Sequence, residues 1–356
     1  MPSPAQPSPD PCRLLFVKLK HIGDALLMTP TLTAVRENYP NTEIWVVVRQ
    51  GTEGILAGCP AIDCLLTVTP IGSTSRGLGS FWRDLRTWFH LYRQQFDFAF
   101  ELTDGDRGRW FAGTTRARQR CVNVSTHRLN LWWRLWFNRQ SKIPWLEKHR
   151  VAKDYHTVTD FLPLKGEIPP LSFATPNIPM PKVARHLDDF VVIHPGTRWA
   201  RKRWPKEYWV QLGHILLRRG HGIILSSGPD NRERNFAHQL LSRWDSCKYA
   251  FSTDGKWSWE ELASCLSNAR AFIGVDTAAM HLAAACQCPV VAIFAHSFAC
   301  QWRPWKSPHV LLDYAGRWDE TDENHLRTKA AKIMKNHTPD KVLAAVDRIL
   351  RPTQRK

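Results

Sequence analysis

The chain has 356 residues, which suits two domains of about 150–180 residues better than one core. Its 43% apolar and 23% charged residues are typical of a globular protein, and no run approaches the ~18 consecutive apolar residues of a membrane span. Lys and Arg outnumber Asp and Glu by 49 to 32, and the net charge of +17 favours anionic partners such as phosphates, nucleic acid or a membrane surface.

The N-terminus is rich in proline and serine and lacks the basic and apolar regions of a signal peptide. We therefore expect residues 1–12 to form a disordered tail. The nine cysteines include no C-x-x-C pair, so we expect reduced, mostly packed thiols, as in a cytosolic protein, rather than a metal or disulfide site.

Continuous apolar runs in the N-terminal half predict strands that are covered on both faces, as in a parallel sheet. These runs are Leu14–Leu19, Ile44–Val48 and Phe96–Leu102. After the first strand a helix begins either at Gly23-Asp24, with a kink at Pro30, or at Pro30, with Thr29 as its N-cap. The sequence does not decide between these two starts.

Six prolines between Leu162 and Lys182 mark the expected linker, and the second half then alternates strands and helices. The predicted elements are strands Phe190–His194 and Gly222–Ser226, strands around Ile273 and Val290, and helices Pro205–Gly220, Ser258–Asn268 and Pro339–Leu350. This alternation predicts an α/β, doubly wound sheet. The predicted domains are residues 13–175 and 176–335, followed by a C-terminal helix and basic tail over 336–356.

Polar residues follow the predicted strands at the edge where open α/β folds bind ligands. Behind the first strand, the segment Lys18-Leu-Lys20-His21-Ile-Gly23-Asp24 places a carboxylate in a glycine-containing turn. Asp24 could serve there as a general base or could merely cap a helix, and the sequence gives both readings about equal weight.

The loop after Phe190–His194 reads Pro-Gly196-Thr197-Arg198-Trp-Ala-Arg201-Lys202-Arg-Trp204-Pro205. A glycine, a hydroxyl and several cations before a helix N-terminus are suited to a diphosphate, and a solvated basic loop is the alternative. Behind the next strand, Asp230 could accept hydrogen bonds from a ribose or cap the following helix.

The most informative segment is Phe-Ile-Gly274-Val-Asp276-Thr277-Ala278-Ala-Met-His281, in which an apolar strand leads to a small-residue helix. We predict that Thr277 is the N-cap of this helix, with backbone N–H groups facing a ligand. Neither a Walker A loop nor the glycine fingerprint of dinucleotide-binding proteins occurs, which disfavours an NAD-dependent enzyme.

Two motifs, Lys-x-x-x-Ile-Gly23-Asp24-Ala-Leu-Leu and Gly274-Val-Asp276-Thr277-x-x-x-His281-Leu-x-Ala-Ala, together resemble the lipopolysaccharide heptosyltransferases, as does His-Pro-Gly-Thr197 with Lys202-Arg-Trp-Pro. The resemblance covers most of the chain and looks most like the branch that adds the third inner-core heptose. It implies two facing Rossmann-like domains of the GT-B type with the active site in an interdomain cleft. It also implies metal-independent, inverting transfer of L-glycero-D-manno-heptose from ADP-heptose to the lipopolysaccharide inner core, with no cofactor.

The resemblance further implies roles for individual residues. Asp24 falls on the proposed base of the family, and acceptor-side candidates beside it are Lys20, His21 and Gly23. The residues that fall on donor-binding positions are Thr197, Arg198, Lys202, Asp230, Asp276, Thr277, Ala278 and His281. Two of these depart from the common family pattern, which often has Glu near Asp230 and Gly at Ala278.

A basic segment concentrates the charge of the chain. From Arg107 to Lys153 there are twelve Lys or Arg and one acid, a local charge of 12 − 1 = +11, around Trp132, Trp133 and Trp136. Such a segment is typical of a membrane interface, which fits peripheral contact with the cytoplasmic face of the inner membrane, where the anionic inner core is assembled. The alternative is a helix whose tryptophans pack into the first domain.

Two other functions remain open from the sequence. A glycosyltransferase of the same architecture could use another nucleotide sugar. A nucleic-acid-binding protein would explain the charge, but no recognised binding motif is present, so we expect no nucleic-acid partner.

Overall fold

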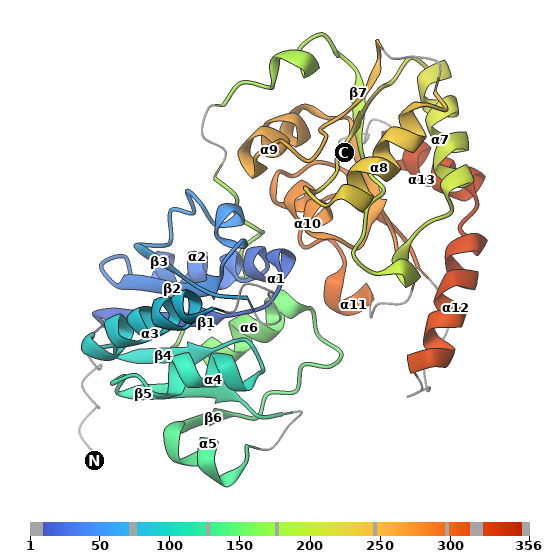
Figure 1. The fold of residues 1–356 in the computed structure, drawn as a ribbon. Coiled ribbons are helices and arrows are strands. Elements are labelled where there is room, and N and C mark those ends of the chain that lie inside the picture. The colour runs from blue at the N-terminus through green and yellow to red at the C-terminus, as the bar shows by residue number, and fades with distance from the viewer. Residues whose placement is uncertain are drawn as a thin grey trace. The chain divides into compact units, whose positions relative to one another are not determined.

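The computed structural model describes residues 10–70, 77–125, 129–174, 178–244, 248–295, 299–313 and 323–350, the last with side chains from residue 329. The greater part of the predicted N-terminal tail and the end of the basic C-terminal tail therefore lie outside the described residues. The chain divides into two compact units between Pro169 and Pro170 (Figure 1), and each unit is described by itself.

Unit 1 contains a parallel sheet with the strand order β3-β2-β1-β4-β5-β6. Its strands are β1 (Arg13–Lys18), β2 (Glu43–Arg49), β3 (Cys64–Val68), β4 (Phe98–Glu101), β5 (Gln119–Asn123) and β6 (Arg139–Ser141). Its helices are α1 (Ile22–Leu26), α2 (Thr29–Asn38), the 3-10 turn η1 (Glu53–Ile55), α3 (Leu78–Arg93), α4 (Asp106–Gly113), α5 (Leu131–Trp136) and α6 (Arg150–Thr159).

Both faces of the central strands in unit 1 are buried, as the continuous apolar runs predicted. Alternate residues of β1, such as Leu15 and Val17, pack with Leu91 of α3, Phe111 of α4 and Trp133 of α5 in one core cluster. The residues between them point to the opposite face, because side chains alternate along a strand. There the ring of Phe16 stacks on that of Phe100, with 5.2 Å between their centroids.

Unit 2 repeats the same design, with the strand order β12-β11-β10-β7-β8-β9 and all pairings parallel. Its strands are β7 (Phe190–His194), β8 (Gly222–Leu225), β9 (Ala250–Ser252), β10 (Ala271–Val275), β11 (Val290–Ile293) and β12 (His309–Leu312). Its helices are η2 (Lys182–Ala184), η3 (Ala200–Lys202), α7 (Lys206–Arg218), α8 (Asn231–Leu241), α9 (Trp259–Asn268), α10 (Ala278–Ala285), α11 (Ala299–Trp302), α12 (Glu323–Asn336) and α13 (Pro339–Leu350).

Both sheets follow the Rossmann strand order, which places a topological switch point between β1 and β4 and another between β7 and β10. The pairing register sets Val17 beside Glu101 in unit 1 and His194 beside Gly274 in unit 2. The predicted fold class of two Rossmann-like domains is thus confirmed. Ligands of such sheets bind at the carboxyl ends of the strands that flank the switch point.

The structure decides the open question of the first helix. The segment forms two helices, α1 and α2, so that Pro30 lies in the first turn of α2 and kinks nothing. The predicted N-cap at Thr29 is wrong by one residue, since Met28 occupies that position and Thr29 donates its hydroxyl hydrogen bond to the carbonyl oxygen of Leu26 at 2.8 Å.

A buried tryptophan fixes the loop that carries Lys202. The Trp204 side chain is 1% exposed, its ring meets that of Trp209 edge-on at 4.6 Å, and its Nε1–H donates to the carbonyl oxygen of His337 at 2.7 Å. Because the ring is anchored in the core of unit 2, the backbone just before it has little freedom to move. The position of the Lys202 side chain follows from this anchor.

Two properties of the described residues bear on the class of protein. The eight cysteines among them are free thiols, and four of these are buried. Within the same residues, no helix is long and apolar enough to cross a bilayer.

Candidate active site

Asp24 lies in the turn that follows β1, at the switch point of unit 1. Its carboxylate is 9% exposed, and Oδ2 accepts a hydrogen bond from the backbone N–H of His21 at 3.2 Å, which closes the start of α1. The capping role that the sequence left open is therefore real. It engages one oxygen, and the described residues provide no hydrogen bond to the other, which leaves an acceptor for a proton.

The acceptor-side candidates share this turn with Asp24. Lys20 and Gly23 are half-buried and His21 is exposed, so all three stand at the sheet edge. The ring of His21 lies 3.3 Å from the guanidinium of Arg49, measured from Nδ1 to NH2, and Arg49 itself ends β2. Sequence reasoning found this turn but had no reason to include Arg49, because β2 meets it only through the pairing of the sheet.

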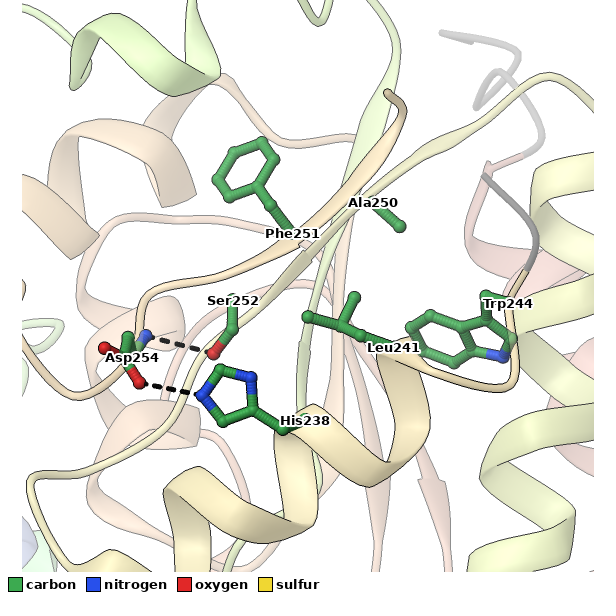
Figure 2. A pocket seen from close by; sticks show the side chains of 7 residues that line it. All are labelled: His238, Leu241, Trp244, Ala250, Phe251, Ser252 and Asp254. Carbon is green, nitrogen blue, oxygen red and sulfur yellow. Dashed lines mark hydrogen bonds and ion pairs between the residues drawn. The ribbon is translucent and has the colours of Figure 1, made fainter. Parts of the chain in front are cut away.

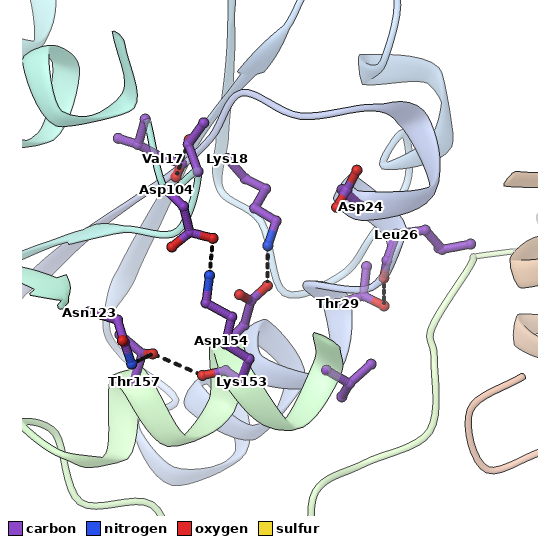
Figure 3. Close-up of polar contacts among 12 residues, drawn as sticks. Val17, Lys18, Asp24, Leu26, Thr29, Asp104, Asn123, Lys153, Asp154 and Thr157 are labelled. Atoms are coloured by element: carbon purple, nitrogen blue, oxygen red, sulfur yellow. Dashed lines mark hydrogen bonds and ion pairs between the residues drawn. The ribbon is translucent and has the colours of Figure 1, made fainter. Parts of the chain in front are cut away.

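Two buried ion pairs lie below the turn of Asp24 (Figure 3). Lys18 at the end of β1 donates to Asp154 of α6, with 2.6 Å between Nζ and Oδ2, and both side chains are almost fully buried. Lys153 of α6 pairs with Asp104, which follows β4 and has a left-handed backbone with φ of 61°. Burial alone would lower the pKa of Lys18, but Asp154 and Asp24 outweigh it and raise that pKa above 10.5.

These pairs correct one inference from the sequence. Lys153 was counted with the cations of the basic segment, but its side chain is 1% exposed and neutralised by Asp104. Asp104 had a detectable signal, since it stands just behind the apolar run of β4, where a parallel strand presents polar residues. Nothing in the sequence connected Asp154 with Lys18, 136 residues away.

Glu101 completes the buried acidic group of unit 1. Its carboxylate is 1% exposed and accepts hydrogen bonds from the backbone N–H groups of Thr103 at 2.8 Å and Asp104 at 3.3 Å. Burial and the neighbouring carboxylate of Asp104 raise the pKa of Glu101 to about 7.

In unit 2, the loop behind β7 wraps around a glutamate. A Cβ on Gly196 would come within 2.8 Å of Oε2 of Glu233, and the N–H of Gly228 donates to the same oxygen at 2.9 Å. Two glycine turns from different strands therefore close on the carboxylate of Glu233, which sequence reasoning missed. Burial lowers the pKa of the adjoining His194 below its usual 6.5, so this imidazole is neutral at pH 7.

A pocket of about 680 Å³ opens beside this carboxylate. It is lined mainly by polar and cationic side chains from the loop after β7 and from α8: Pro195, Gly196, Thr197, Arg198, Arg203, Asp230, Arg232, Glu233, Asn235, Phe236 and Gln239. The predicted residues Thr197, Arg198 and Asp230 are thus brought together. One oxygen of Asp230 caps α8, since Oδ1 accepts a hydrogen bond from the N–H of Arg232 at 2.8 Å.

Lys202 and Asp276 meet at the second switch point. The ammonium of Lys202, in η3, forms an ion pair with the carboxylate of Asp276, which follows β10. Both side chains are largely buried, at 17% and 8% exposure. The two residues lie 74 positions apart in the chain, and the sequence assigned both to the same ligand without evidence that they touch.

Thr277 is the N-cap of α10 by position, as predicted, but its side chain makes no capping hydrogen bond. Among the described residues its hydroxyl is buried without a hydrogen-bond partner. A buried hydroxyl in that state is an unusual cost that a polar ligand would remove. Ala278 follows it as the first residue of the helix, and His281, 2% exposed, lies one turn further on.

A second pocket, of about 290 Å³, lies between α8 and β9 (Figure 2). There the ring of His238 is 3.0 Å from Asp254, between Nε2 and Oδ1, and hydrogen bonds from Lys256 and His238 lower the pKa of Asp254. None of the residues singled out in the sequence lines it. In the described parts of the chain, no group of three His, Cys, Asp or Glu side chains could hold a metal ion.

Solved structures share this fold over nearly the whole chain. The Escherichia coli heptosyltransferase WaaC with ADP has a TM-score of 0.76 at 18% identity and covers 95% of this chain and 99% of its own. The E. coli ADP-heptose lps heptosyltransferase II has the same TM-score at 13% identity, over 95% of this chain and 98% of its own. The fold and these likenesses define the GT-B architecture of two Rossmann-like domains.

The chain belongs to glycosyltransferase family 9 (heptosyltransferase), whose model matches residues 85–327. Among named proteins, lipopolysaccharide heptosyltransferase 3 of E. coli is 26% identical over 335 residues, which are 92% of this chain and 96% of the relative. Lipopolysaccharide heptosyltransferase 1 of Pseudomonas aeruginosa is 25% identical over 306 residues, 79% of this chain and 78% of the relative. The resemblance inferred from the motifs is confirmed.

Proposed function

We propose that this enzyme transfers L-glycero-D-manno-heptose from ADP-heptose to a heptose of the lipopolysaccharide inner core, with inversion, as the third heptose of that core. The observation that carries the proposal is the meeting of Lys202 and Asp276 at the β7/β10 switch point, beside Thr277 and the start of α10. Among the relatives, one is named lipopolysaccharide heptosyltransferase 3, and one structure contains WaaC with ADP-2-deoxy-2-fluoro heptose.

The donor half of the reaction is assigned to unit 2. The diphosphate would compete with Asp276 for the ammonium of Lys202, and the N–H groups at the start of α10 would add hydrogen bonds to it. The unpartnered hydroxyl of Thr277 would gain a phosphate or sugar oxygen as acceptor. As the glycosidic bond breaks, negative charge grows on the departing ADP, and each such preorganised donor stabilises it by a few kcal/mol.

A ribose would be recognised beside the glycine turns of the same unit. Glu233 is the better placed of the two acids, because its carboxylate stands where the turns of Gly196 and Gly228 meet. The sequence-based assignment of Asp230 to the ribose stays a prediction. Our proposal gives the carboxylate of Glu233 the principal role.

The acceptor half is assigned to unit 1, with Asp24 as the general base. Its second oxygen would take the proton of the acceptor hydroxyl while the hydroxyl oxygen attacks the anomeric carbon of the donor. A single displacement of this kind inverts the configuration at that carbon. Lys20, His21 and Arg49 stand beside the carboxylate and could bind acidic groups of the inner core.

We also propose that the enzyme works in the cytoplasm, in peripheral contact with the inner membrane. The support is chemical: the proposed acceptor is attached to a lipid. The segment from Arg107 to Lys153 carries a charge of +11 by sequence count, to which the buried and paired Lys153 adds nothing at the surface. No metal or cofactor has a step in this mechanism.

A donor panel tests the proposal. Isothermal titration with ADP, UDP, GDP and CDP should give tightest binding for ADP, and ADP-heptose should be turned over in the presence of an inner-core acceptor that lacks its branch heptose. Turnover of a UDP- or GDP-sugar instead would retain the glycosyltransferase and overturn the heptose donor.

A further inference from the structure

The helix α3 presents an apolar stripe to solvent. Leu78, Phe81, Trp82 and Phe89 are 81%, 61%, 62% and 51% exposed. Positions 78, 82 and 89 fall on one helical face, because they are four and seven residues apart, and Phe81 adjoins them. The other side of α3 is packed on the sheet through Leu91. The stripe is therefore not the core-facing side of an ordinary amphipathic helix.

The stripe continues onto the two neighbouring helices. Trp110 of α4 is 45% exposed and lies against Trp88 of α3, with 6.2 Å between ring centroids. On α5, Trp133 is buried and donates from Nε1 to Asp106 of α4 at 2.9 Å, which leaves its neighbours pointing outward. The exposed side chains of α5 are Leu131, Trp132 and Leu135.

We call these eight side chains the apolar face: Leu78, Phe81, Trp82, Phe89, Trp110, Leu131, Trp132 and Leu135. In the described parts of the chain thirteen large apolar side chains are exposed, so most of them gather on three adjacent helices. All three helices cover the same core cluster and so lie on one side of the sheet of unit 1. Such a concentration is rare on a monomer that has no partner at that surface.

Arginines accompany the apolar face, and the acids near it are already paired. Arg86 and Arg93 of α3 and Arg134 of α5 are exposed, and the guanidinium of Arg93 lies over the ring of Phe89 at 5.5 Å. The two acidic residues are held by other arginines: Asp84 by Arg107 at 2.6 Å and Asp106 by Arg109 at 2.9 Å. The surface is thus apolar with a surplus of positive charge.

We infer that the apolar face docks this enzyme on an anionic bilayer, with α3 lying in the headgroup layer. Aromatic and leucine side chains would enter the boundary with the acyl chains, and the flanking arginines would reach lipid phosphates, as interfacial helices do. The choice of a bilayer rests on the proposed function, because a lipid-borne acceptor has to be met at a membrane surface. The apolar face retains Trp110, Leu131, Trp132 and Leu135 of the basic segment and extends the contact to α3.

Flotation with large unilamellar vesicles tests the inference. The wild-type protein should bind vesicles of phosphatidylcholine with 30% phosphatidylglycerol, and Phe81→Glu/Trp82→Glu should bind them at least tenfold more weakly. The matched control is Val183→Glu/Tyr249→Glu, which places the same charges at half-exposed apolar positions of unit 2 and should bind like wild type. Arg86→Glu/Arg93→Glu should lose at least tenfold on the anionic vesicles.

Several results would overturn it. Equal binding by wild type and Phe81→Glu/Trp82→Glu would exclude the apolar face, and absence of wild-type binding would exclude docking on lipid. A dimer in sedimentation that the same variant dissociates, without vesicle binding, would assign the face to a second copy of the chain. Because Phe81, Trp82, Arg86 and Arg93 are exposed, their substitution should leave the melting temperature unchanged.

The test is separate from that of the proposed function. With a deacylated, water-soluble acceptor, Phe81→Glu/Trp82→Glu should release ADP from ADP-heptose as fast as wild type does. If no variant released ADP while flotation followed the expected pattern, the proposed function would fail and the docking surface would stand.

Discussion

Replacing Lys18 by Met tests whether the ion pair beneath Asp24 is as buried as the structure has it. The Lys18 and Asp154 side chains are 3% and 0% exposed, with 2.6 Å between Nζ and Oδ2. Methionine keeps the length of the side chain but leaves the carboxylate of Asp154 without its cation. Removing one partner of a buried pair typically costs about 3–5 kcal/mol in the free energy of unfolding.

The expected loss corresponds to a fall of about 6–20 °C in the melting temperature of a unit of this size, at roughly 2–4 °C per kcal/mol. Lys18→Met/Asp154→Asn removes both charges together, so it should recover at least half of the lost free energy. The assay is urea unfolding followed by circular dichroism, with attention to the transition of unit 1, since two units need not unfold in one step.

The pH dependence has a definite sign. The pKa of Lys18 is raised in the folded protein, so its stabilising contribution is complete below the unfolded value of 10.5 and is lost only as the pH rises through the folded pKa. The contribution of Lys18 itself should therefore be constant between pH 7 and pH 9. A loss below about 1 kcal/mol, the scale of an exposed pair, or a double variant no more stable than the single one, would refute the reasoning.

Three further predictions concern Lys202, Glu233 and Glu101. Lys202→Ala should raise the Kd for ADP about tenfold to hundredfold, as expected for a lost charged hydrogen bond. Lys335→Ala, at an exposed position of α12, should leave the Kd unchanged, and equal Kd values for the two variants would contradict the assignment. Glu233→Gln should raise the Kd for ADP about twofold to tenfold in calorimetry, and an unchanged Kd would remove Glu233 from the ribose site. The pKa of Glu101 is raised from 4.5 to about 7 in the folded protein. The free energy of unfolding of the wild type should therefore fall as the pH rises from 4.5 to 7, by on the order of 3 kcal/mol. Urea titrations of Glu101→Gln should lack this dependence on pH.

The strands that sequence reasoning found are those buried on both faces, because only they form continuous apolar runs. Strand β2 (Glu43–Arg49) and strand β10 (Ala271–Val275) are of this kind. Strand β6 (Arg139–Ser141) reads as a polar loop, since it is a short edge strand with two exposed residues. Helix α3 escaped notice because its apolar side chains serve both the core and the solvent-facing stripe.

The candidate site was predictable where a residue lies close behind a strand end. Asp276 directly follows β10, Thr197 lies three residues after β7 and Asp24 six residues after β1. Parallel pairing brings such ends to one edge of each sheet. Pairs that depend on side-chain direction were not predictable. Lys153 looked like a surface cation in sequence, and only the packing of α6 against the sheet buries it.

Glu233 shows a third limit. It lies one helical turn after Asp230, and both follow the same strand, so sequence alone favoured the earlier acid. We prefer Glu233 because the N–H of Gly228 holds its carboxylate between two glycine turns, whereas Asp230 accepts from the N–H of Arg232 at the start of α8. The choice between two nearby acids depends on turn geometry that no residue pattern encodes.

The most direct test of the account is ADP release from ADP-heptose by Asp24→Asn, with an inner-core acceptor that lacks its branch heptose. Loss of a general base should reduce turnover by ~10²–10⁴ while the Kd for the donor stays unchanged, and Glu37→Gln, at an exposed acid of α2, should behave as wild type. Turnover near the wild-type rate in Asp24→Asn, or loss of donor binding in that variant, would contradict the assignment of Asp24 as the base.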